Sequence, residues 1–230
     1  FNRTHGVYFG EAAAYASIQG NFIGVDPSGN PIPNDGNGIW IMEGSSAIQV
    51  GGTDPGAGNR IAYNGGAGVS LGWGTTDVTS GISILGNSIY ANGGVGIARW
   101  PGVNGGIAPP ALTLGALVSG MTVPNTVVEL FADAGDEGQT FLERVTADET
   151  GAFVSGVSPS SYPGMTVTAT ATDANGLRRT THKADQPPKP ATEAGASAGV
   201  FKRGLTRSDV LGSGFRRGAV GGGRPGPVLL

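Results

Sequence analysis

The sequence predicts an all-β protein with two differently built regions, stacked short parallel strands over residues 1–107 and an antiparallel β-sandwich over residues 108–184. Three observations carry this prediction. Residues 1–107 hold 25 Gly and 10 Asn, which recur at fixed intervals. Residues 108–184 hold only 8 Gly and 2 Asn, and instead alternate apolar with polar side chains. Residues 185–230 follow neither pattern, and their Gly, Arg and Pro content predicts a disordered tail.

The first region contains an internal repeat. Gly58–Leu71 (GNRIAYNGGAGVSL) and Gly86–Arg99 (GNSIYANGGVGIAR) are identical at seven of fourteen positions. A glycine opens each apolar run, and successive opening glycines are 32, 30 and 28 residues apart: Gly6, Gly38, Gly68 and Gly96. Runs this short do not form helices, and repeat units of this size cannot bury their inner faces alone. Stacking gives them one continuous core, which predicts a parallel β-solenoid of about three coils.

The runs after these glycines define an inner and an outer face. The residue directly after each glycine is β-branched, so we expect it to line the interior: Val7, Ile39, Val69 and Ile97. Because side chains alternate along a strand, the following residue points outward. These outward residues are Tyr8, Trp40, Ser70 and Ala98. Five positions after the glycine come Glu11, Glu43, Trp73 and Pro101.

Asparagine and glycine have two expected roles at the corners between strands. Both tolerate the left-handed backbone conformations that tight corners require. Stacked asparagine side chains also form hydrogen bonds from coil to coil, as they do in cross-β ladders. The repeat predicts two such structural ladders: Asn21, Asn59 and Asn87 in one, and Asn34, Asn64 and Asn92 in the other.

The second region carries strand patterns separated by Asp, Gly and Pro turns. The candidate strands are Ala111–Leu114, Thr126–Asp133, Thr140–Thr146, Gly151–Val157 and Met165–Thr172. Short strands at this spacing are typical of an immunoglobulin-like antiparallel sandwich. Along Thr126–Asp133, Val127, Glu129 and Phe131 share one face, and Val128, Leu130 and Ala132 share the other.

Two long motifs resemble a known group of proteins. GNFIGVDPSGNPIPNDGNGIWI, followed by GGTDPGAGNRIAYNGGAGV, resembles bacterial secreted or surface right-handed parallel β-helix proteins, many of which carry a CSLREA-type region upstream. TVVELFAD and VTATATDANG resemble the β-sandwich that often follows the helix in this group. The resemblance, over about residues 14–180, implies a pectate-lyase-like right-handed β-helix and an extracellular or cell-surface localisation in bacteria. It implies no activity, because most members have no established biochemistry.

Composition argues against several function classes. The chain has no Cys and two His, so no zinc cluster is expected. DAGDEG at Asp133–Gly138 supplies three carboxylates but lacks EF-hand spacing, so we expect a solvated loop, no metal and no cofactor. Residues 1–184 carry 14 acidic and 7 basic side chains, which argues against nucleic-acid binding. No run of 18 apolar residues exists, so no membrane span is expected.

One group of outward side chains is a candidate carbohydrate site. Neighbouring coils lie about 4.8 Å apart, so Tyr8 and Trp40 should form an exposed aromatic step. Glu11 and Glu43 should stack beside it, with Trp73 next in line. Aromatic faces pack against the C–H groups of a sugar ring, and carboxylates accept hydrogen bonds from its hydroxyls. The alternative is that Tyr8 and Trp40 cover the next coil or lie under a loop.

These features favour a non-enzymatic extracellular structural or adhesive module, with a polysaccharide or cell-surface glycan as candidate partner and no catalytic residue. One alternative is a carbohydrate-active enzyme, a polysaccharide lyase or glycoside hydrolase of the β-helix type, with Glu11 and Glu43 as its acid–base pair. Another is a purely structural fragment without a ligand. Gly6 lies in mid-pattern, so the first coil has no visible cap. We therefore expect either that the chain is a piece of a longer protein or that another copy covers this end by end-to-end self-association.

Overall fold

The computed structural model describes residues 2–173 and 180–182, and of the last three residues it describes the backbone alone. Apart from turns and two 3-10 segments, η1 (Val103–Gly106) and η2 (Pro159–Ser161), the regular structure in this part of the chain is β-strand. The all-β prediction is therefore confirmed. The predicted disordered tail, residues 185–230, lies outside the described residues.

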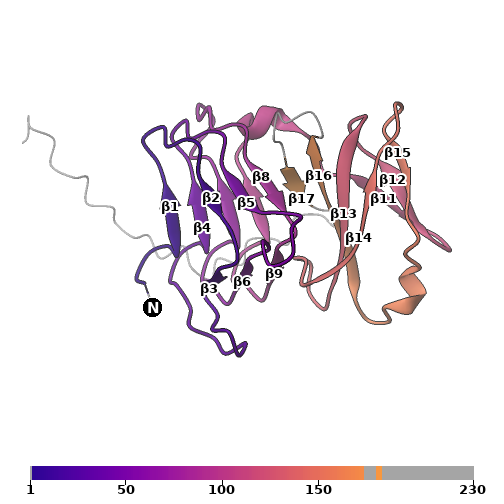
Figure 1. Cartoon of the computed structure of the whole chain (residues 1–230), viewed down its shortest axis with the longest axis horizontal. Coiled ribbons are helices and arrows are strands. Elements are labelled where there is room, and N and C mark those ends of the chain that lie inside the picture. The colour runs from indigo at the N-terminus through magenta and orange to yellow at the C-terminus, as the bar shows by residue number, and fades with distance from the viewer. Residues whose placement is uncertain (1, 174–179, 183–230) are drawn as a thin grey trace, which may run out of the picture. The chain divides into compact units, whose positions relative to one another are not determined.

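Strands β1 to β10 form three parallel sheets (Figure 1). The first contains, in order, β1 (Val7–Phe9), β4 (Ile39–Ile41), β7 (Val69–Leu71) and β10 (Ile97–Arg99). The second contains β2 (Ser17–Ile18), β5 (Gln49–Gly51) and β8 (Ser83–Leu85). The third contains β3 (Phe22–Ile23), β6 (Arg60–Ala62) and β9 (Ser88–Tyr90). The chain visits the sheets in turn, so β1–β3, β4–β6 and β7–β9 are called coil 1, coil 2 and coil 3, and together with β10 they form the coil stack.

The pairing register confirms the predicted inner column of the coil stack. Ile39 is paired with Val7 on one side and with Val69 on the other, and Val69 is paired with Ile97. Ile39 and Val69 are both 0% exposed, and they pack in one cluster with inner residues of the other two sheets, such as Ile61 and Ile84. Each coil contributes too few apolar side chains for a core of its own, so burial depends on its neighbours.

Glycine is required at the opening positions because the next coil lies too close for a Cβ atom, and not because the backbone there is left-handed. A Cβ atom on Gly38 would lie 2.6 Å from the carbonyl oxygen of Gly68 and 2.6 Å from Cγ2 of Ile61. Gly6 and Gly68 would meet the next coil in the same way. Left-handed residues do occur at the corners, but the expectation that Gly and Asn supply them was only partly right, because Glu, Ala and Tyr also occupy such positions.

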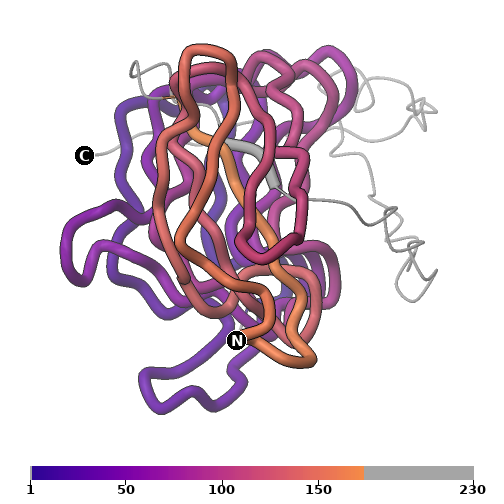
Figure 2. Tube along the Cα trace, turned by 90° about the vertical axis from the view of Figure 1, so that its right-hand side faces the viewer, coloured from indigo at the N-terminus to yellow at the C-terminus, as the bar shows by residue number. Residues whose placement is uncertain are grey.

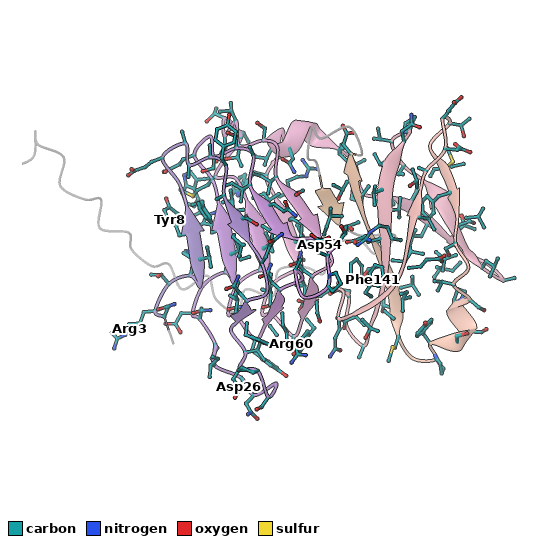
Figure 3. The ribbon with its side chains drawn as sticks, in the orientation of Figure 1. Arg3, Tyr8, Asp26, Asp54, Arg60 and Phe141 are labelled. Atoms are coloured by element: carbon teal, nitrogen blue, oxygen red, sulfur yellow. The ribbon has the colours of Figure 1, made fainter. Side chains whose placement is uncertain are left out.

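The corners vary in length while the strands keep their register. The longest connection, between β3 and β4, projects from the coil stack and carries Asp26 (Figure 3). Asp26 accepts hydrogen bonds from the backbone and side chain of Asn30, both at 2.8 Å, which closes the loop on itself. In Figure 2, which looks along the stack, the successive coils lie behind one another. Length differences are therefore absorbed outside the core.

The second region contains two antiparallel sheets. One has the order β11 (Ala111–Leu114), β12 (Val118–Met121) and β15 (Ala152–Val154). The other has the order β14 (Thr140–Thr146), β13 (Thr126–Asp133), β16 (Thr166–Asp173) and β17 (Thr180–His182). Val118 and Phe153 of the first sheet share a buried cluster with Val128, Leu130 and Ala169 of the second. The two sheets therefore pack against each other, and β12 and β17 are strands that the sequence did not predict.

Strand β13 is buried on both faces. Val128 and Leu130 point into the cluster between the antiparallel sheets, as the alternation predicts. On the other face, Glu129 and Phe131 are also buried, because that face lies against the end of the coil stack, where Glu129 binds the backbone of Gly86. The contact between the two regions therefore removes this second face of β13 from solvent.

Candidate functional site

Three aromatic side chains form a continuous row across coils 1 to 3. Tyr8 on β1 is paired with Trp40 on β4, and their ring centroids are 5.8 Å apart. Trp40 lies 5.5 Å from Trp73, which follows β7 at the next corner. Tyr8 is 50% exposed and Trp73 is 55% exposed, and Figure 3 shows Tyr8 on the outer side of β1. Tyr8, Trp40 and Trp73 are called the aromatic row.

Trp40 is the fixed centre of the aromatic row. Its indole N–H donates to the carbonyl oxygen of Gly72 at 3.1 Å, which ties coil 2 to coil 3. The His5 ring packs against it, with centroids 4.7 Å apart. Burial lowers the pKa of His5, whose Nδ1 accepts the backbone N–H of Asn37. Trp40 therefore covers the next coil, as the alternative interpretation held, while Tyr8 and Trp73 remain open to a ligand.

The carboxylates beside the aromatic row form a ladder of their own. Oε2 of Glu43 accepts the backbone N–H of Glu11 at 3.1 Å and the hydroxyl of Tyr8 at 3.4 Å. In coil 3 the equivalent place is taken by Asp77, whose Oδ2 accepts the backbone N–H groups of Glu43 at 2.9 Å and Trp73 at 2.7 Å. Glu43 and Asp77 thus each accept a backbone N–H from the preceding coil.

Asp77 was not assigned to this site from the sequence, because only positions up to five residues after each opening glycine were compared. Asp77 lies four residues beyond Trp73 and so was not compared with Glu11 and Glu43. Asp77 could have been predicted as a site residue from its place in the corner after the first sheet, since the same corner supplies Glu11 and Glu43 in the earlier coils. Partial burial opposes ionisation of Asp77, but hydrogen bonds from Thr79, Glu43 and Gly44 outweigh it and lower its pKa to about 2. Burial and the neighbouring Glu43 raise the pKa of Tyr8. Asp77 therefore keeps its negative charge at any physiological pH.

The corner backbone is unusual at both glutamates. Glu11 has φ 54° and Glu43 has φ 56°, in the left-handed region that side chains disfavour by about 1–2 kcal/mol per residue. A glycine would adopt this conformation without strain. The hydrogen bond from Glu11 N–H to Glu43 and the bond from Glu43 N–H to Asp77 offset part of that strain.

A groove runs along the coils next to this corner. It has a volume of about 1120 Å³ and is lined by residues of all three coils, including Tyr15, Ser46, Gln49, Thr75 and Asp77. Among the described residues that line it, Asp77 alone is charged. We call it the side groove. Because it follows the stacking direction, its shape suits an elongated ligand better than a compact one.

The first asparagine ladder joins all three coils on the corner between the second and third sheets. Oδ1 of Asn59 accepts from the backbone N–H (2.9 Å) and Nδ2 (3.1 Å) of Asn21. Oδ1 of Asn87 accepts from the same two groups of Asn59 at 3.0 Å and 2.8 Å. In the other direction, Nδ2 of Asn59 donates to the carbonyl of Ile18 at 2.8 Å. These side chains thus bind backbone groups of the neighbouring coil.

The second asparagine ladder lies on the corner after the third sheet. Nδ2 of Asn34 donates to Oδ1 of Asn64 at 2.7 Å, and Nδ2 of Asn64 donates to Oδ1 of Asn92 at 2.9 Å. Asn64 is completely buried. Beyond Asn92 the ladder meets Glu137 of the antiparallel region rather than another asparagine. The structure thus brings together all six asparagines in the two predicted sets.

The DAGDEG segment is not the solvated loop that the sequence suggested. Asp133 and Glu137 are both buried. Asp133 accepts the backbone N–H groups of Gly135, Gly138 and Gln139, so it closes its own turn. Glu137 instead points to Asn92. The carboxylates turn to different partners because the segment packs against the coil stack.

Comparison with protein-family models gives no match to this chain, and comparison with curated proteins gives none either. Within residues 2–173, no three His, Cys, Asp or Glu side chains gather in a way that could hold a metal ion. Among the described residues there is also no helix of the length and apolarity needed to cross a membrane.

Proposed function

We propose that this chain is a non-enzymatic structural or adhesive module of a bacterial surface or secreted protein. Its architecture would be a short right-handed parallel β-helix of the CSLREA-type group followed by an immunoglobulin-like β-sandwich. The three parallel sheets visited in turn support the first assignment, and the two antiparallel sheets with a shared core support the second. Localisation outside the cell follows from the sequence resemblance.

The ligand that this surface fits best is a polysaccharide. The observation that carries this proposal is the aromatic row, which is contiguous over three coils and half exposed at both ends. Neighbouring rings meet edge to face, at 69° and 61°, so they present a stepped surface rather than a flat one. Aromatic faces bind the apolar C–H side of sugar rings, and a stepped row can meet successive units of a twisted chain.

The charges near the aromatic row favour a neutral polysaccharide over an acidic one. Glu11, Glu43 and Asp77 surround it, and like charges would repel uronates or sulfated sugars. The arginines of the coil stack face elsewhere. Arg60 lies over the Phe22 ring at 5.5 Å, and Arg99 donates to the carbonyls of Val103 and Ile107. Neutral sugar hydroxyls can donate to the carboxylates without this repulsion.

The carboxylate contacts favour binding over catalysis. Hydrolysis of glycosidic bonds needs two carboxyl groups free to exchange protons with the substrate. Oε2 of Glu43 already accepts from Glu11 and Tyr8, and Asp77 accepts from four backbone N–H groups, those of Glu43, Gly44, Trp73 and Thr79. These contacts hold the corners in place. The carbohydrate-active enzyme is therefore less well supported than the adhesive module.

Substitution of the exposed rings tests the proposal. Trp73→Ala and Tyr8→Ala should each weaken retention on a panel of immobilised neutral polysaccharides about fivefold, because one lost ring contact is worth roughly 1 kcal/mol. Phe22→Ala is the matched control, since Phe22 is also half exposed but lies on the third sheet. Equal retention of all four proteins on every polysaccharide would refute the binding surface. Release of unsaturated products from polyuronates by wild type but not by Glu43→Gln would favour the lyase alternative.

A further inference from the structure

The last full coil is closed by side chains that come from outside the repeat. Coil 3 has three corners: one between β7 and β8, one between β8 and β9, and one between β9 and β10. In coils 1 and 2, corner groups bind the equivalent corner of the next coil. At coil 3 each corner instead meets one buried residue that follows β10 in the chain: Asn104, Glu129 and Glu137. We call these three residues the closing residues.

Glu137 closes the corner between β9 and β10. Its Oε1 accepts the backbone N–H of Asn92 at 2.8 Å, and its Oε2 accepts Nδ2 of Asn92 at 2.7 Å. One coil earlier, the backbone N–H and Nδ2 of Asn64 donate in the same way to Oδ1 of Asn92. The Glu137 carboxylate therefore takes the place of the next ladder asparagine, and only 7% of the residue is exposed.

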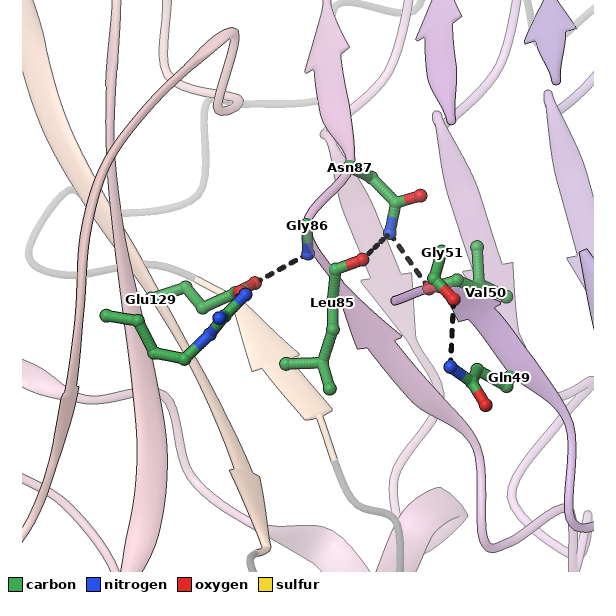
Figure 4. Close-up of polar contacts among 8 residues, drawn as sticks. Gln49, Val50, Gly51, Leu85, Gly86, Asn87 and Glu129 are labelled. Carbon is green, nitrogen blue, oxygen red and sulfur yellow. Dashed lines mark hydrogen bonds and ion pairs between the residues drawn. The ribbon is translucent and has the colours of Figure 1, made fainter. Parts of the chain in front are cut away.

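Glu129 closes the corner between β8 and β9. Its Oε2 accepts the backbone N–H of Gly86 at 2.9 Å (Figure 4). Its Oε1 accepts the Nε–H of Arg144 at 3.0 Å. Figure 4 also shows Asn87 donating back to the carbonyls of Leu85 and Val50, so the carboxylate lies where the first asparagine ladder ends. Glu129 is 1% exposed, and a buried carboxylate is stable only with partners such as these.

Asn104 closes the corner between β7 and β8. Its Oδ1 accepts the backbone N–H of Ile82 at 2.9 Å, and its Nδ2 donates to the carbonyl of Ile82 at 2.7 Å. Asn104 is fully buried and has a left-handed backbone, φ 55°. Along β9, the carbonyl of Gly138 accepts the N–H of Ile89, which extends the closure from the corners to the strand edge.

The chemistry of the two glutamates differs from that of the asparagines in one respect. An asparagine side chain accepts with its oxygen and donates with its nitrogen, so a ladder of asparagines can continue from coil to coil. An ionised carboxylate only accepts, so it satisfies the donors of one coil and passes no donor on. We propose that the antiparallel region, together with Asn104, acts as the terminating cap of the coil stack: Glu137 ends the second asparagine ladder, Glu129 closes the corner beside the end of the first ladder, and Asn104 closes the remaining corner.

Residue-resolved hydrogen exchange on the full chain tests the cap. The exchange is measured at pH 8, where the Glu137 carboxylate is ionised and both of its oxygens accept from Asn92. In Glu137→Gln, one accepting oxygen becomes an amide NH2 group that faces the Asn92 donors. The backbone amides of Asn92 and Ile89 should then exchange at least tenfold faster, whereas the amide of Val7 in coil 1 should be unchanged. Glu129→Gln should accelerate the amide of Gly86 in the same way. Glu149→Gln is the matched control, because Glu149 is exposed and lies away from the junction.

The pattern of protection decides the outcome. Acceleration confined to coil 3 in both closing variants, with none in Glu149→Gln, is the expected result. Unchanged exchange at Asn92 and Gly86 would overturn the cap, and so would equal acceleration in coils 1 and 3. If Glu137→Gln does not fold, Glu137→Asp replaces it, since it keeps the charge but withdraws the carboxylate by one methylene, and the same localisation is required.

Discussion

Left-handed backbone at the corners is the residue-scale feature with the most direct energetic consequence. Tyr63 and Ala91 occupy the same corner position in coils 2 and 3, with φ values of 60° and 53°. Glycine adopts this conformation freely, whereas a residue with a Cβ atom carries a cost of about 1–2 kcal/mol. Coils 2 and 3 therefore both hold strain at this corner position.

Ala91→Gly should raise the free energy of unfolding by about 1 kcal/mol, because the relief of strain exceeds the added entropy of the unfolded chain. Ala91 is exposed, so no buried contact is lost. Urea denaturation measures the change. The control is Ala14→Gly, at an exposed alanine outside the left-handed region, which should lower stability. Destabilisation of both variants to the same extent would contradict the strain argument.

Glu137 gives the protein a pH dependence that can be isolated. Burial raises its pKa to about 7, against the hydrogen bonds from Asn92 and with a further contribution from Asp133 and Asp136. The folded state binds the Glu137 proton more tightly than the unfolded state does. The resulting contribution to the free energy of unfolding is therefore complete below pH 4.5 and is lost as pH rises through 7. Wild type should therefore lose up to about 3 kcal/mol of stability from this group between pH 5 and 8.

The measurement is the urea midpoint of wild type and Glu137→Gln at four pH values across that range. His5 acts in the opposite direction, because its lowered pKa makes stability fall toward acid pH. Since both proteins contain His5, its effect cancels when the stability of one protein is subtracted from that of the other. Asp77, with a pKa of about 2, titrates below the window. A difference that stays constant with pH would show that Glu137 does not titrate there.

At the scale of elements, the asparagine ladders distinguish inner coils from the outer one. Asn59 donates to Ile18 and to Asn87 while its oxygen accepts from Asn21, so it serves three coils. Asn21 donates to Asn59 and to Gln19 of its own coil. A buried corner with unsatisfied backbone groups costs about 1–3 kcal/mol for each lost partner.

Asn59→Ala should therefore destabilise the protein by several times more than Asn21→Ala, with both compared by thermal unfolding. The reason is position alone, since the two substitutions remove the same atoms from equivalent corners. Similar losses in the two variants would mean that the ladder contributes through each corner separately rather than through the contacts between coils.

The elements that the sequence predicted are those with a repeating or alternating pattern. The inner column from Val7 to Ile97 follows from the spacing of glycines, and strands such as Thr126–Asp133 follow from alternation. Asp77, Glu129 and Glu137 were not assigned their roles, because each contacts a partner far along the chain that no periodicity marks. Strand β12 was missed since VSGM contains a glycine and little alternation.

At the scale of the whole molecule, the two ends of the coil stack differ. Strands β1, β2 and β3 are the edge strands of their sheets, whereas coil 3 meets β10 and the closing residues. Edge strands with unpaired backbone groups are templates for further pairing. End-to-end self-association through coil 1 stays a prediction, and light scattering over a hundredfold concentration range should show a growing dimer fraction. A monodisperse monomer at the highest concentration would contradict it.

The projecting loop between β3 and β4 has a practical consequence. Its tip closes through Asp26 and Asn30, and a Cβ atom on Gly29 would meet nothing within 4 Å. Foreign peptide sequence placed at this tip would extend away from the three sheets and leave Ile23 and Asn34 on their own partners. The protein thus offers a natural display position, where an epitope could be carried without redesigning the framework.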